Sequence, residues 1–103
     1  MSVIKLTKEN FVDEVMQAGN PVLIDFYADW CGPCKMLAPT IDALARTRDD
    51  IKVCKVNVDE QPELATTFEI SVIPTLVAMR DGGVLAKRTG VMPKDAILKM
   101  LGL

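Results

Sequence analysis

The chain contains no histidine among its 103 residues, and this absence excludes two kinds of site. A cysteine nucleophile activated by a neighbouring histidine cannot form, because the general base of that pair is missing. A zinc site with mixed cysteine and histidine ligands is excluded for the same reason. Only three cysteines are present. They are too few and too unevenly spaced for the disulfide framework of a small secreted protein.

The chain also lacks an excess of basic charge and a long apolar segment. Its formal net charge is −2, with both signs mixed along the sequence, so nucleic acid is not an expected partner. No apolar run approaches the roughly 20 residues that cross a bilayer. The first twenty residues carry charged side chains instead of the apolar core of a secretory signal, although a mature form with its leader removed would look the same. We therefore expect a cytoplasmic protein that is not membrane-bound.

Half of the residues are hydrophobic, which allows a packed core without disulfide staples. A chain of this length fits one domain, so we expect residues 1–103 to form a single domain, and we expect that domain to be a monomer. The sequence shows no internal repeats, low-complexity tracts or linkers.

Strand-like and helix-like segments alternate along the chain. The apolar runs 22–27 and 51–58 are typical of strands buried on both faces of a sheet. Asp81-Gly82, between the runs 75–79 and 84–89, predicts a hairpin. With a short strand at 4–6, the order predicts an α/β fold in which a central mixed five-stranded sheet is flanked by four helices. These helices are expected to begin at Thr7, Pro33, Pro62 and Pro93.

Cys31 and Cys34 form a Cys-x-x-Cys pair between the strand 22–27 and a predicted helix. A thiol at a helix N-terminus lies in the positive end of the backbone dipole, which favours the nucleophilic thiolate. Cys31 is the expected nucleophile, and Cys34 is close enough to attack what Cys31 captures. Three other roles remain open: a structural disulfide, a metal site joined by Cys54, and an iron–sulfur cluster shared between two subunits.

Asp25 is a carboxylate inside an apolar run, flanked by Ile24 and Phe26. If the strand is central, burial raises the pKa of Asp25, and the carboxylate becomes a candidate general base for Cys34. The alternative is an aspartate at the strand end that reaches water. Lys55, on the next predicted strand, is the expected partner of Asp25, or else a solvated lysine. Cys54 is expected to be an inert core thiol.

The order of these motifs resembles the thioredoxin family, and the match covers nearly the whole chain. A Cys-x-x-Cys near a βαβ pattern is a known signal of that family. The sequence departs from the family pattern at Tyr27, where many members have tryptophan, at Val72, where glycine is common, and at Cys54, which is additional. The matching segments are Asp25-Phe26-Tyr27-Ala28, Trp30-Cys31-Gly32-Pro33-Cys34-Lys35, Pro39, Lys55, Ile73-Pro74-Thr75 and Gly90.

The resemblance implies the thioredoxin fold and the activity of a general protein-disulfide reductase. It implies that Trp30, which could otherwise be a core aromatic, is partly exposed beside the dithiol, and that the Ile73–Pro74 peptide bond is cis. It also implies no bound cofactor or metal, with electrons supplied from NADPH by a separate flavoprotein, thioredoxin reductase. A binding module built on the same fold is the alternative function. The groove that binds disulfide-containing target proteins is expected to comprise Trp30, Gly32, Pro33, Ile73, Pro74, Gly90 and Val91.

Overall fold

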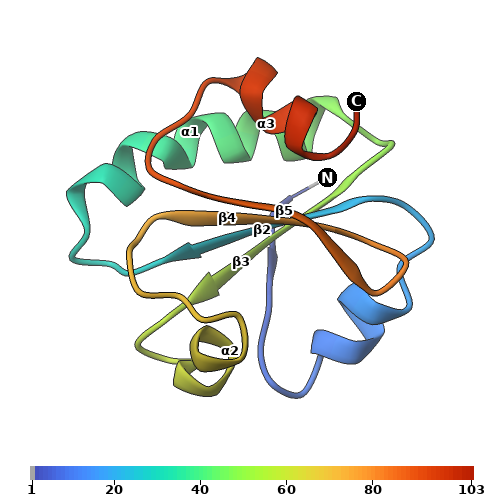
Figure 1. Ribbon diagram of the computed structural model, residues 1–103. Coiled ribbons are helices and arrows are strands. Elements are labelled where there is room, and N and C mark those ends of the chain that lie inside the picture. Colours follow the sequence, from blue (N-terminus) through green and yellow to red (C-terminus); the bar gives the residue numbers. More distant parts are fainter. Residues whose placement is uncertain (1) are drawn as a thin grey trace.

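A computed structural model describes residues 2–103 of the chain (Figure 1). It contains a five-stranded sheet in the order β1-β3-β2-β4-β5, in which β2 pairs parallel to β3 and antiparallel to β4. The expectation of a central mixed sheet is thus confirmed. The strands are β1 (Ile4–Lys5), β2 (Val22–Tyr27), β3 (Lys52–Asn57), β4 (Thr75–Arg80) and β5 (Gly83–Thr89).

Helices cover both faces of the sheet. Helices α1 (Gly32–Thr47) and α3 (Lys94–Met100) lie over one face, above the sheet in Figure 1. Helix α2 (Pro62–Thr67) and the short helix η1 (Val12–Met16) lie over the other face. Each face has its own core, because side chains of successive strand residues alternate between the two faces. Leu23 of β2 belongs to the core under α1 and α3, whereas Ile24 belongs to the core on the side of η1 and α2.

Helix α1 places the dithiol. Cys31 is its N-terminal cap, and Pro33 stands in the first turn, where its missing N–H has no intrahelical acceptor to lose. Leu37, Ile41 and Leu44 are almost fully buried against the sheet. This apolar face fixes the helix on β2 and β3, and with it the cysteines at its N-terminus.

The first helix is shorter than the sequence predicts. Thr7 does cap the segment, since its hydroxyl accepts from the Asn10 N–H while the Asn10 side chain accepts from the Thr7 N–H. The helix proper begins later, however, and is a π-type turn. Its backbone bond runs from the N–H of Gln17 to the carbonyl of Val12, five residues earlier.

The hairpin between β4 and β5 turns at Asp81-Gly82, as predicted. Both residues have positive φ, 52° at Asp81 and 78° at Gly82. A two-residue turn of this kind requires positive φ at both central positions, which explains the Asp-Gly pair. Among residues 2–103, no helix combines the length and the apolar character that crossing a bilayer requires.

Candidate functional site

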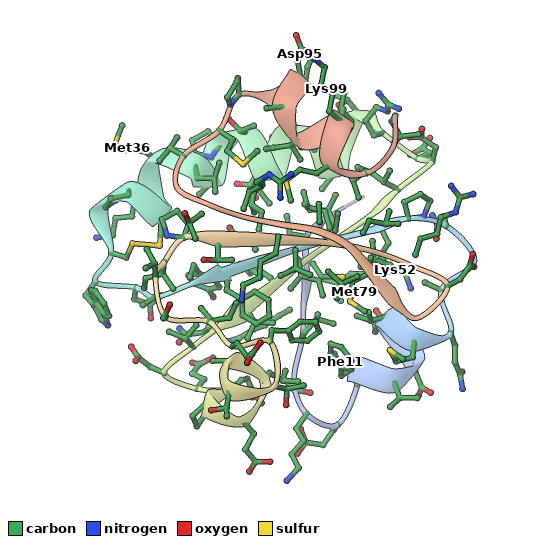
Figure 2. All side chains as sticks on the ribbon, viewed as in Figure 1. Phe11, Met36, Lys52, Met79, Asp95 and Lys99 are labelled. Carbon is green, nitrogen blue, oxygen red and sulfur yellow. A yellow bond between two sulfur atoms is a disulfide. The ribbon has the colours of Figure 1, made fainter. Side chains whose placement is uncertain are left out.

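Cys31 and Cys34 are joined by a disulfide at the N-terminus of α1, visible as the yellow bond in Figure 2. Their Cα atoms are 5.2 Å apart. The backbone N–H of Cys34 donates to Cys31 Sγ at 3.2 Å, so one N–H of the first helical turn points toward this sulfur. A negative charge on Cys31 Sγ would be stabilised by this N–H and by the positive end of the helix dipole. The arrangement is that of a dithiol able to open and close its own disulfide.

Asp25 is buried, as predicted. It is only 5% exposed, and its Oδ1 has no hydrogen-bond partner within residues 2–103. Loss of hydration raises the pKa of Asp25 to about 7; the positive charge of Lys55 acts to lower it and the negative charge of Asp42 to raise it. A carboxyl group with this pKa exchanges its proton near neutral pH.

Asp25 and Cys34 open onto one cavity of about 200 Å³ between the sheet and α1. Polar and apolar side chains share its walls, and its volume is enough to hold water. Transfer of a proton between Cys34 and Asp25 across this cavity stays a prediction. The residues lining the cavity are Val3, Asp25, Tyr27, Ala28, Asp29, Cys34, Lys35, Ala38, Ile41, Asp42 and Lys55.

Lys55 stands beside Asp25 in the parallel register of β3 and β2. Its ammonium group, however, lies over the ring of Tyr27, with Nζ 5.7 Å from the ring centroid. The ion pairs found among residues 2–103 do not include one between Lys55 and Asp25. Lys55 thus acts on Asp25 through space in this structure, and direct pairing of the two stays a prediction.

The surface next to the dithiol is apolar and exposed. Trp30 is 71% exposed, and its indole Nε1 donates to Asp59 Oδ2 at 2.8 Å. This bond holds the ring at the surface instead of in the core. Asp59 is not among the residues expected at the site. It lies two residues after β3, whose last residue, Asn57, pairs with the last residue of β2, and this position is the signal that could have revealed it.

Next to Cys31 the chain turns through Ile73–Pro74, which is a cis peptide bond as predicted. Cys31 Sγ lies 3.9 Å from the carbonyl oxygen of Ile73. The backbone N–H of Gly90 donates to the Pro74 carbonyl at 2.9 Å, so the end of β5 is fixed against this turn. Val91, the next residue, is about half exposed.

The structure therefore brings Ile73, Pro74, Gly90 and Val91 to the Cys31 side of the disulfide. Gly32 and Pro33 are exposed in the first turn of α1. The role of these residues in binding a target stays a prediction.

Cys54 is fully buried in the core on the η1 and α2 side, paired in register with Ile24. Burial raises the pKa of its thiol to about 12. A neutral, inaccessible thiol agrees with the predicted inert core residue. Cys54 also belongs to a different packed cluster from Cys31 and Cys34, so the three thiols do not gather at one site.

The chain matches the thioredoxin family model over residues 2–102. Thioredoxin of Pseudomonas aeruginosa is 39% identical over 100 residues, which covers 96% of this chain and 93% of that protein. Thioredoxin of Mycobacterium bovis is 42% identical over 101 residues, which covers 97% of this chain and 87% of that protein. Thioredoxin of Staphylococcus haemolyticus is 43% identical over 102 residues, which covers 98% of this chain and 96% of that protein. With its Cys31–Cys34 disulfide at the head of α1, this chain belongs to the thioredoxin family of disulfide oxidoreductases.

Proposed function

We propose that this chain reduces disulfide bonds in other proteins through Cys31 and Cys34. The observation that carries the proposal is the position of the reversible disulfide. Its first sulfur caps a helix beside an exposed apolar surface, while its second opens onto the same cavity as the buried Asp25. The two cysteines therefore have different surroundings, as sequential attack requires.

The reaction proceeds in two exchanges. The Cys31 thiolate attacks one sulfur of the target disulfide, which forms a mixed disulfide and releases the other target sulfur as a thiolate. Cys34 then loses its proton and attacks Cys31 Sγ, which breaks the mixed disulfide and releases the second target thiolate. The target gains two electrons and, after protonation, two thiols. The chain loses two electrons and is left with the Cys31–Cys34 disulfide.

Asp25 acts as the general base in the second exchange. A base works best when its pKa lies close to the operating pH, and the pKa of about 7 for Asp25 meets this condition. The carboxylate takes the proton of Cys34 within their shared cavity. Lys55 stabilises the ionised form of Asp25 through its positive charge.

Target proteins bind across the apolar surface around Cys31. Trp30 and Val91 provide exposed apolar contact area. An extended target segment pairs with the backbone at Ile73, next to the cis-Pro74 turn, in the manner of an added strand. Gly32 and Pro33, which are exposed next to Cys31, complete the contact surface. Val72, which is 55% exposed, adds an apolar contact at a position where glycine is common in the family.

The oxidised chain is returned to the dithiol by a separate NADPH-dependent flavoprotein, thioredoxin reductase. Family membership supports this partner, and the Gly32-Pro33 pair between the cysteines fits a reductant better than an oxidant. We further propose that residues 1–103 act as a single domain, as a monomer, and in the cytoplasm, where such electron donors are available.

The direct test of the function is the reduction of insulin by dithiothreitol with catalytic amounts of the protein. We expect rapid precipitation of the insulin B chain with the unmodified protein and with Cys54→Ala, and only the slow background rate with Cys31→Ser. Background precipitation with the unmodified protein would instead favour a binding module without turnover. Titration of the disulfide against glutathione buffers then gives the reduction potential.

A further inference from the structure

Asp42 shares the cavity that connects Asp25 with Cys34. Cys34, Ala38 and Asp42 follow one another at four-residue intervals on α1, and all three line the cavity. Side chains at this spacing lie on one face of a helix, so Asp42 lies two turns beyond Cys34, about 12 Å along the axis. The short side chain of Ala38, between them, leaves this face of the helix open.

Asp42 is one of the exposed residues that line the cavity. Its side chain is exposed, in contrast to that of Asp25. A second hollow of about 360 Å³, lined by Ser2, Val3, Asp42 and Arg46, shares Val3 and Asp42 with the first. The carboxylate thus lies where the space around Asp25 continues toward the outside of the molecule.

Charged groups of both signs face Asp25 in this space. Lys55 approaches from β3, Lys35 and Asp42 from α1, and Asp29 from the end of β2; Tyr27 and Cys34 are the other titratable groups in the wall. Asp42 takes part in none of the ion pairs found among residues 2–103. Its negative charge is therefore not neutralised by a direct partner in the structure.

We propose that Asp42 is a positioning residue for the reaction, acting through Asp25. Its carboxylate, where the cavity meets the second hollow, opposes the charge of Lys55, and the balance of the two sets the pH range in which Cys34 resolves the mixed disulfide. This proposal rests on the proposed function, since it assumes that Asp25 accepts the proton of Cys34.

The direction of the effect follows from electrostatics. A negative charge near Asp25 disfavours a second one, and Asp42 accordingly raises the pKa of Asp25 while Lys55 lowers it. Asp42→Asn therefore lowers the pH at which Asp25 ionises, by about 0.3 pH unit for charges separated by roughly 10 Å in a largely aqueous surrounding. Lys55→Gln shifts the same midpoint in the opposite direction.

The first test follows the carboxyl carbon of Asp25 by NMR between pH 5 and pH 9. The oxidised protein is used, because Cys34 does not titrate in the disulfide and so cannot couple to Asp25. We expect Asp42→Asn to lower the midpoint, Lys55→Gln to raise it, and Asp42→Glu, which keeps the charge, to restore it. Asp49→Asn is the matched control, because it removes the same charge from an exposed residue that lies outside the cavity.

The second test measures the single-turnover release of a target from the mixed disulfide across the same pH range. We expect the rising limb of this pH profile to move to lower pH by about 0.3 unit in Asp42→Asn, as the Asp25 midpoint does, and to stay in place in Asp49→Asn. A merely structural role of Asp42 would change the amplitude of release without moving the limb.

The two tests separate failure of this inference from failure of the proposed function. If Asp42→Asn leaves both the midpoint and the limb unchanged while Asp25→Asn removes the limb, Asp42 has no such role and the base assignment survives. If the limb persists in Asp25→Asn, the base assignment is wrong, and the positioning role falls with it, whatever the NMR midpoint shows.

Discussion

Asp25→Asn is expected to stabilise the protein while it slows the reaction. The substitution keeps the shape of the buried side chain but removes its ionisation. In the folded protein the pKa of Asp25 is about 7, because burial disfavours the charged form, whereas an aspartate in the unfolded chain has a pKa of about 3.9. Between these two values the folded state holds a proton that the unfolded state has lost.

This difference fixes the sign and size of the effect. A group that binds more protons in the folded state makes stability fall as pH rises, with the slope set by one proton. For a folded pKa of about 7, the free energy of unfolding falls by about 3 kcal/mol between pH 5 and pH 9, and the fall is complete above the folded pKa. Asparagine has no such loss, so the stability advantage of Asp25→Asn grows by the same amount between pH 5 and pH 9.

Urea unfolding of the oxidised proteins at pH 5 and pH 9 measures the advantage. With a typical urea dependence for a small protein, about 3 kcal/mol corresponds to a midpoint shift of about 1 to 3 M. Asp95→Asn is the control, because Asp95 is exposed on α3, pointing away from the sheet (Figure 2). An advantage that is equal at both pH values, or smaller at pH 9, would refute the burial of an ionisable Asp25 as the cause.

Two further substitutions test other parts of the structure. Cys54→Ala should leave insulin reduction unchanged and cost about 1 to 2 kcal/mol of stability from lost core packing, measured by urea unfolding. In the native reduced protein, iodoacetamide should label Cys31 before Cys54. Fast labelling of Cys54 would contradict its burial. Gly90→Ala should destabilise the protein by about 1 kcal/mol because φ at Gly90 is +93°, a conformation that costs an alanine about that much, and it should raise the KM for target reduction. Gly19→Ala is the matched control, because Gly19 has no positive φ and the added Cβ would meet no atom. Equal losses of stability in both variants would remove the conformational explanation.

The elements with the clearest patterns were the ones predicted best. The apolar run of β2 and the Asp81-Gly82 hairpin have strong signals, because burial on both faces and a turn with positive φ each permit few residue types. The first helix was predicted too long. The spacing of its apolar residues suits a regular helix; these residues are Phe11, Val12, Val15 and Met16. The π-type hydrogen bond from Gln17 N–H to the Val12 carbonyl depends on packing, which the spacing of apolar residues does not reveal.

The site was predicted in its chemistry more than in its geometry. Cys31, Cys34 and Asp25 could be found because their residue types are unusual where they stand. The position of Lys55 over Tyr27, and the bond from Trp30 to Asp59, depend on side-chain conformations and on contacts between distant segments. The eight-residue spacing between Cys34 and Asp42 places both on one face of α1, but this spacing could be related to the site only once the cavity was known.

The central claim is that Cys31 attacks the target and Cys34 resolves the mixed disulfide. The most direct measurement is to react Cys31→Ser and Cys34→Ser with an oxidised target and to separate the products on non-reducing gels. We expect a covalent adduct with Cys34→Ser, because attack still occurs and release does not, and no adduct with Cys31→Ser. Equal trapping by the two variants, or an adduct only with Cys31→Ser, would contradict the account.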